Sequence, residues 1–244
     1  MNTFLTEVSQ TLVPRGEAKH GPLPPLLVAM TLVTGLVDAF SYLVLGHVFV
    51  ANMTGNVVFL GFALAGASGF SILASLVALC SFALGSLVGG IMGSRLGNHR
   101  GHLLSIAAVL QTLLLIAAAV LAALSGNPVP AGFSYSLIIV LGITMGVQNA
   151  TARKLAVPDL TTTVLTLTIV GIGADSHLAG GSGSKAGRRL IAVAAMFVGA
   201  LIGSLLIFHI SIVYPLVLAL VVMMGVAVTT RVLSRGDPAW VRAS

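Results

Sequence analysis

The stretch GLVDAFSYLVLGHVFVANMTGNVVFLG, residues 35–61, decides the fold of this chain. It is apolar enough to enter a membrane, yet it carries an aspartate, Asp38, and the polar run NMTGN at residues 52–56. A charged side chain at the centre of a bilayer costs about 2.5–3.5 kcal/mol on insertion scales. We therefore expect these polar groups to face protein, water or a bound molecule rather than lipid.

The composition of the whole chain indicates an integral membrane protein. Of its 244 residues 57% are hydrophobic and only 7% are charged, and the mean hydropathy is +1.08, whereas a soluble domain has roughly 25% charged residues. The net charge of +6 comes from small basic clusters between apolar runs, which predicts a lipid bilayer and no nucleic acid as partner. The histidines and the single cysteine show no metal-ligand or catalytic spacing, so we expect no metal, no cofactor and no enzyme activity.

Windows of about 20 apolar residues, the length that crosses the hydrocarbon, predict an all-α membrane protein with six full transmembrane helices. Two further apolar pieces are shorter and richer in Thr, Asn and Gly, which predicts short or broken membrane segments. The six spans are residues 26–45, 70–94, 102–124, 133–152, 189–209 and 212–231, and the two short pieces are residues 48–66 and 160–175.

The positions of the basic residues favour six crossings over eight, because short loops that carry Lys and Arg tend to remain in the cytoplasm. With eight crossings the clusters near residues 95–100 and 153–154 would lie outside, whereas with six crossings every cluster lies inside. The sequence thus predicts a cytoplasmic N-terminal tail at 1–25, one transmembrane domain at 26–231 and a cytoplasmic C-terminal tail at 232–244. The basic residues are Arg15, Lys19, Arg95, Arg100, Arg153, Lys154, Lys185, Arg188, Arg189, Arg231, Arg235 and Arg242.

Weak internal similarities predict a duplicated unit. GLVDA at 35–39 resembles GVQNA at 146–150, and TGNVVFLG at 54–61 resembles TLTIVGIG at 166–173. The two halves, about 26–124 and 133–231, would each cross three times, so the second would run through the membrane in the opposite sense. This is the inverted 3+3 repeat of many transporters, whose sites lie between the halves at interrupted helices.

The polar residues of these segments form the candidate substrate site. Asp38 lies about twelve residues into the first span, which places it ~18 Å deep at ~1.5 Å per residue. One interpretation is a substrate, cation or proton site, and the other is a packing aspartate bonded to neighbouring amides. The candidates are Asp38, Asn52, Thr54, Asn56, Gln148, Asn149 and Arg153.

The run at 52–56 suits the start of a half-helix inside the membrane. Asn and Thr side chains can cap the free N–H groups of such a start, and its positive dipole end can hold an anion. The alternative is that these residues only satisfy one another at the break. Arg153 either anchors its helix in the cytoplasm or turns toward the cavity, where it would hold an anion or pair with an acid such as Asp38 or Asp159.

Glycines spaced by four residues place small residues on one face of two spans. Such faces allow helix backbones to approach closely, which predicts packing between the two halves or a homodimer. The two sets are Gly85, Gly89 and Gly93, and Gly199 and Gly203.

The stretch at 35–61, together with MGVQNATARKLAVPDLTTTVLTLTIVG at 145–171, resembles the YoaK-like family of bacterial multi-pass membrane proteins. The Asp-Ala pair, the ANMTGN run and the Gln-Asn-Ala-x-x-Arg run carry the resemblance, which covers almost the whole chain after residue 25. It implies a location in the bacterial inner membrane and supplies no substrate or activity.

Two functions from different classes fit these observations. The first is a small secondary transporter or channel-like permease for a small polar solute, with Asp38 as the carboxylate that couples to a proton or cation. The second is a membrane scaffold or interaction protein in which the same polar groups lock two helix bundles together.

Overall fold

A computed structural model describes residues 3–13, 19–160, 162, 165–176, 179–181 and 186–242. The described part is all helical, and six of its helices are long and apolar enough to span a membrane, which confirms the predicted class. The six are α2 (Leu23–Val44), α4 (Ile72–Leu96), α5 (Arg100–Ser125), α6 (Ala131–Leu155), α8 (Ala186–His209) and α9 (Tyr214–Leu233). The shorter helices are α1 (Thr3–Leu12), α3 (Met53–Leu64), α7 (Leu165–Ala174) and the 3₁₀ turn η2 (Ala239–Val241).

Local sequence explains where several helices begin. Pro24 and Pro25 lie in the first turn of α2, where a missing N–H costs nothing. The Ser71 hydroxyl accepts from the Ala74 N–H at 3.2 Å and starts α4. His99 starts α5 in the same way, because its Nδ1 accepts from the His102 N–H at 3.0 Å.

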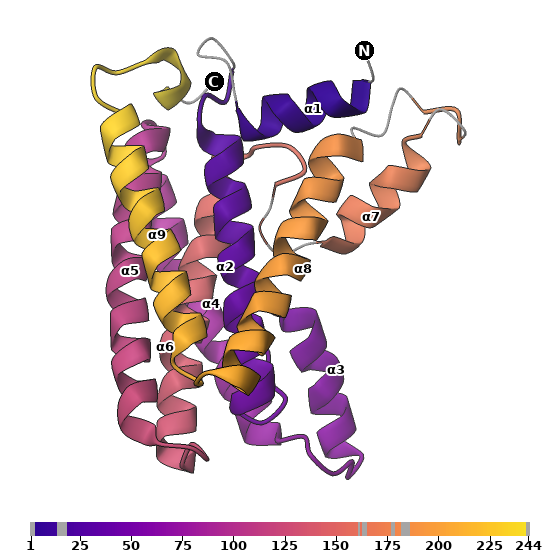
Figure 1. Ribbon diagram of the computed structural model, residues 1–244, viewed down its shortest axis with the longest axis vertical. Coiled ribbons are helices and arrows are strands. Elements are labelled where there is room, and N and C mark those ends of the chain that lie inside the picture. Colours follow the sequence, from indigo (N-terminus) through magenta and orange to yellow (C-terminus); the bar gives the residue numbers. More distant parts are fainter. Residues whose placement is uncertain are drawn as a thin grey trace.

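Both ends of the chain lie at one end of the helix bundle, which we call the termini end (Figure 1). This agrees with an even number of crossings. Helices α4, α6 and α9 carry basic residues in their last turns, and α5 begins with Arg100, so these basic groups gather at the termini end. Arg15 and Lys185 lie outside the described residues. The assignment of this end to the cytoplasm stays a prediction.

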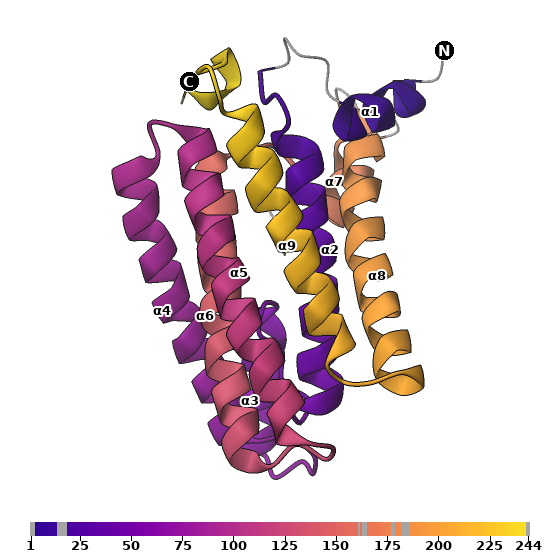
Figure 2. The ribbon, with the colours of Figure 1, turned by 60° about the vertical axis from the view of Figure 1, so that its left-hand side comes forward.

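The long helices pair across the two halves of the sequence. Helix α2 packs along α8, and α4 packs along α6 (Figures 1 and 2). A Cβ atom added to Gly35 of α2 would lie 2.2 Å from the carbonyl oxygen of Met196 in α8. A Cβ added to Gly146 of α6 would lie equally close to the carbonyl oxygen of Phe82 in α4. Only glycine allows two helix backbones to approach this closely.

The glycine faces of α4 and α8 lie in these same contacts. Gly85 and Gly89 face Ile143 and Val147 of α6, and Gly199 faces Leu32 of α2. The predicted packing use of these glycines is therefore present within one chain. A homodimer through the same glycines stays a prediction.

Both tails contain structure that the sequence analysis did not anticipate. Helix α1 packs against α8, where the Glu7 carboxylate accepts from the Gly187 N–H in the first turn of α8 at 2.9 Å. At the other terminus the Trp240 ring packs against Gly21, so closely that a Cβ on Gly21 would lie 2.4 Å from the ring. The N-terminal tail thus packs on α8, and the two tails contact each other at the termini end.

Candidate functional site

The first short membrane segment turns back into the bundle instead of crossing it. After α2 ends at Val44, the backbone N–H groups of Val50 and Ala51 reach the side chain of Asp38. Asp38 lies six residues before the end of α2, so the chain returns by ~9 Å. Non-helical backbone at such a depth is tolerated only where it is buried in protein or lines a water-filled cavity. Val50 and Ala51 are indeed buried.

Helix α3 then leads back to the end from which the segment came. His47, before α3, contacts the carbonyl oxygen of Gly69, after α3, at 3.0 Å. The two ends of the segment, residues 45–71, are therefore neighbours, and they lie opposite the termini end (Figure 1). We call this segment the α3 hairpin. It matches the prediction of a piece that enters and leaves on one side.

Asp38 holds the α3 hairpin with both carboxylate oxygens. Its Oδ1 accepts from the N–H groups of Val50 at 3.0 Å and Ala51 at 2.9 Å, and its Oδ2 accepts from the side-chain amide of Asn52. Only 4% of Asp38 is exposed. Hydrogen bonds to an ionised acceptor are roughly twice as strong as neutral ones. Asp38 thus fixes the turn that precedes α3.

The capping role expected of Asn52 is wrong, because the side chain makes no cap hydrogen bond to α3 and points to Asp38 instead. Asn56 is fully buried and closes the turn from the other side. Its Oδ1 accepts from the Phe49 N–H at 2.9 Å, and its Nδ2 donates to the Phe49 carbonyl oxygen at 2.5 Å. Thr54 is exposed on α3 and does not join this cluster.

Aromatic rings pack the α3 hairpin against its neighbours. Phe49 stacks on Tyr42 of α2 at a centroid distance of 5.1 Å and lies 5.6 Å from Phe59 of α3. Phe59 in turn stacks on Phe70 at 5.2 Å. Polar contacts fix the turn of the hairpin, and these rings fix its outer part.

A second polar cluster joins α2 to α6. The Gln148 amide nitrogen donates to the Thr34 hydroxyl at 2.8 Å and to the Met30 carbonyl oxygen at 3.1 Å. Gln148 Oε1 is buried with no hydrogen-bond partner in the described part of the chain, and so is the hydroxyl oxygen of Thr151, one turn further along α6. This cluster, which we call the α2–α6 seam, comprises Thr34, Gln148 and Thr151.

The remaining two candidates lie outside both clusters. The Asn149 side chain donates to the Met145 carbonyl oxygen of its own helix at 2.9 Å, and Arg153 is exposed at the termini end of α6. The seven predicted residues therefore do not form one site. Asp38 of α2 meets the turn of the α3 hairpin, which holds Asn52 and Asn56, while Gln148 belongs to the α2–α6 seam.

The second short segment is held by an ion-pair cluster that the sequence analysis did not identify. Arg189 of α8 donates through Nε to Asp159 at 2.9 Å and through Nη2 to Asp175 at 2.8 Å. These acids flank α7, and the guanidinium lies over Gly171 of α7, where an added Cβ would be 2.2 Å from Nη1. The sequence signal for this cluster was an acid at each end of the short apolar piece, Asp159 and Asp175, followed by Arg189 in the next span.

A cavity of about 320 Å³ opens at the end opposite the termini, between the start of α4, the start of α6 and the turn after α2. Ser71, Ser134 and Tyr135 line it together with apolar groups such as Leu45 and Ile138. On α6, Ile138, Leu141 and Met145 are at most 1% exposed, and they separate this cavity from Gln148.

Comparison with known proteins adds a family and a similar transmembrane protein. Residues 26–229 match the family model described as "Protein of unknown function (DUF1275)". The chain is 36% identical over 148 residues to the UPF0700 transmembrane protein YoaK of Bacillus subtilis (strain 168). That match covers 60% of this chain and 64% of the relative, so it spans less than two thirds of the relative's length. No solved structure matches the chain.

Proposed function

This chain belongs to the DUF1275 family of proteins of unknown function, and from that premise we propose that it is a small permease for a polar solute, not an enzyme. Its multi-pass membrane architecture is established by the six spanning helices and by the similarity to a transmembrane protein. The proposal places it in a bacterial cytoplasmic membrane with both termini in the cytoplasm.

The observation that carries the proposal is the pair of unpartnered oxygens at the α2–α6 seam. Gln148 and Thr151 are both fully buried, and Gln148 Oε1 and Thr151 Oγ1 lack hydrogen bonds within the described structure. A buried polar atom without a partner costs about 1–3 kcal/mol. Two such atoms one turn apart in the same protein core would accept hydrogen bonds from a solute with N–H or O–H groups, or from water along its path.

Matching contacts in the two halves support an inverted repeat around this seam. Gly35 meets Met196, Ala200 and Gly199 in the same order and at nearly the same distances as Gly146 meets Phe82, Ser86 and Gly85. In the proposed repeat, α2 and α6 are counterparts, and so are α8 and α4. A symmetry axis that exchanges α2 and α6 must pass between them. Transporters with inverted repeats bind their substrates at such an interface.

The two short segments fit the same arrangement, because α3 lies at one end of the bundle and α7 at the termini end (Figure 1). In this proposal Asp38 positions the α3 hairpin, since both of its oxygens already accept hydrogen bonds from that hairpin. Asp38, which the sequence analysis proposed as the coupling carboxylate, thus positions the α3 hairpin and does not contact the solute. Access to Gln148 requires Ile138, Leu141 and Met145 to separate from their neighbours.

The rival function, a scaffold without transport, has one observation in its favour. Asp38, Asn52 and Asn56 are satisfied by one another and by the backbone, which a purely structural role also explains. The unpartnered oxygens of the α2–α6 seam favour the permease, because a scaffold gains nothing from leaving them without hydrogen bonds.

The test is solute entry into proteoliposomes that contain the purified chain. Swelling in isosmotic urea, glycerol, glycine and small sugars is followed by light scattering, with empty liposomes as baseline. We expect one of these solutes to enter faster with protein, and Gln148→Met to reduce that rate at least tenfold. Gln111→Met is the matched control, because Gln111 of α5 is also buried with an unpartnered oxygen but lies outside the seam.

Two outcomes would overturn the proposal. Entry no faster than in empty liposomes for every solute tested would favour the scaffold. An equal loss of entry in Gln148→Met and Gln111→Met, with both proteins folded, would remove the α2–α6 seam as the site.

A further inference from the structure

A groove of about 490 Å³ lies between α5 and α9 near the termini end. Its walls are apolar and face outward, and Ile106, Val109, Val228 and Val232 are each 47–58% exposed. Arg231 and Arg235 line its polar end. The groove is separate from both polar clusters described above.

The two arginines at this groove have no anionic partner in the described part of the chain. Arg231 lies in the last turn of α9 and Arg235 in the turn that follows the helix, and both line the groove. The acid that follows them, Asp237, is already engaged by Arg242 at 2.8 Å and lies 3.6 Å from His99. Two guanidinium groups without an anionic partner in the described residues therefore lie at the polar end of this apolar groove.

We propose that this groove binds an anionic phospholipid. The phosphate of the headgroup lies between Arg231 and Arg235, and one acyl chain follows the apolar walls formed by α5 and α9. Guanidinium groups match phosphate oxygens in geometry and charge. The outward-facing apolar walls continue into the hydrocarbon, where an acyl chain is already present, so a lipid satisfies both parts of the groove at once.

The test is lipid binding to the purified protein in detergent, measured by native mass spectrometry with dioleoyl phosphatidylglycerol and with dioleoyl phosphatidylcholine. We expect preferential binding of phosphatidylglycerol. Loss of two cations near the surface should weaken that binding by about thirtyfold in Arg231→Gln/Arg235→Gln. The matched control is Arg95→Gln/Arg153→Gln, which removes two exposed arginines from the same end of the bundle, away from the groove.

A third variant separates the acyl chain from the headgroup. Val109→Trp fills the groove and keeps both arginines, and we expect it to weaken phosphatidylglycerol binding as well. Inorganic phosphate at millimolar concentration should not displace the lipid, because it cannot occupy the apolar part. Equal weakening in the control pair, undiminished binding in Val109→Trp or displacement by phosphate would each overturn the proposal.

Discussion

Gly35 and Gly199 lie against each other where α2 crosses α8, so closely that a Cβ on Gly199 would be 3.2 Å from the Gly35 Cα. The same relationship links Gly146 and Gly85, where α6 crosses α4. The atoms in contact belong to the backbone, so no change of rotamer can make room for a larger residue. These crossings fix the positions of α2 and α6, and hence of the seam between them.

Gly35→Ala should therefore destabilise the protein by about 1–3 kcal/mol, the usual cost of overpacking. The measurement is unfolding in detergent followed by circular dichroism. Gly90→Ala is the control, since Gly90 lies in α4 with no atom within 4 Å of an added Cβ. Because Ala favours helix over Gly, this change should be neutral or stabilising by up to about 1 kcal/mol. Equal destabilisation by both changes would contradict the close-contact argument.

Asp38→Ala should release the α3 hairpin, because it leaves three N–H donors without an acceptor, each worth about 1–3 kcal/mol when buried. In a Cys80→Ala background, a cysteine at Ala51 reports the release, since Ala51 is only 3% exposed. We expect this cysteine to be protected from maleimide in the parent and to react in the Asp38→Ala variant. Thr54→Ala, a change at an exposed position of the same hairpin, should keep it protected. Continued protection in Asp38→Ala would show that other contacts hold the hairpin.

Arg189→Gln should loosen α7, because Arg189 joins the acids on both sides of it. Asp175 is half exposed, which limits the contribution of its pair with Arg189. Hydrogen exchange over residues 165–174 should become about tenfold faster, corresponding to about 1.4 kcal/mol. Arg188→Gln, at the adjacent position, should leave this exchange unchanged. An unaltered rate in Arg189→Gln would mean that apolar contacts alone hold α7.

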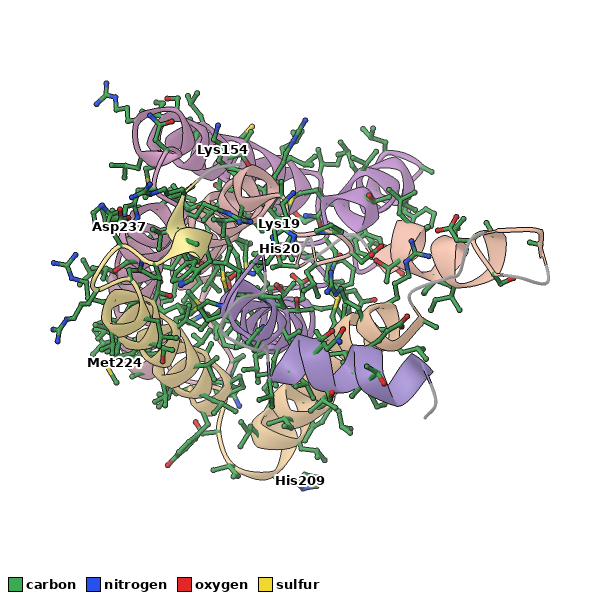
Figure 3. The ribbon with its side chains drawn as sticks, turned by 90° about the horizontal axis from the view of Figure 1, so that it is seen from above. Lys19, His20, Lys154, His209, Met224 and Asp237 are labelled. Carbon is green, nitrogen blue, oxygen red and sulfur yellow. The ribbon has the colours of Figure 1, made fainter. Side chains whose placement is uncertain are left out.

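Acid should destabilise the termini end through His20. Burial, followed by the charge of Arg100, lowers the pKa of His20 from its usual 6.5. Arg100 Nη2 lies 3.1 Å from His20 Nδ1, so this nitrogen must accept and the folded state favours the neutral ring. The unfolded chain takes up the proton more readily, so stability falls as the pH drops below about 6.5. Figure 3 shows His20 near the middle of the molecule, seen from above.

The measurement is the thermal midpoint at pH 7.5 and at pH 5. The decrease on acidification should be smaller in His20→Gln than in the parent. His209→Gln, which changes an exposed histidine at the opposite end, should keep the full decrease. The same pH dependence in the parent and in His20→Gln would assign the effect to another group.

The orientation in the membrane can be tested with cysteines at positions 95 and 154 in the Cys80→Ala background. Both positions are exposed at the termini end, so both should react with an impermeant maleimide only after the cells are opened. Labelling of either one in intact cells would contradict six crossings with cytoplasmic termini.

The features that could be predicted from the sequence are those that depend on a local pattern of residues. The six spans follow from hydropathy, and Asp38, Asn52 and Asn56 meet because one short stretch of chain carries all three. Gln148 was expected beside Asp38 but contacts Thr34 and Met30, one turn or more earlier on α2. The position along each helix at which two helices cross depends on glycine contacts such as Gly35 with Met196. A hydropathy pattern does not predict these positions. The ion pairs of Arg189 join residues far apart in sequence, and they were missed for the same reason.

The pairing of α2 with α8 also has a consequence for synthesis. Of the six described spans α2 is made before α8, with three spans between them, so α2 stays in the membrane without its partner while those three are made. During that time its glycine face has no matching surface, whereas α4 meets α6 much earlier. A nascent chain that stops before α8 can insert its first four spans yet cannot complete its core. Quality-control proteases should therefore degrade such truncated chains, because neither half is a self-sufficient folding unit.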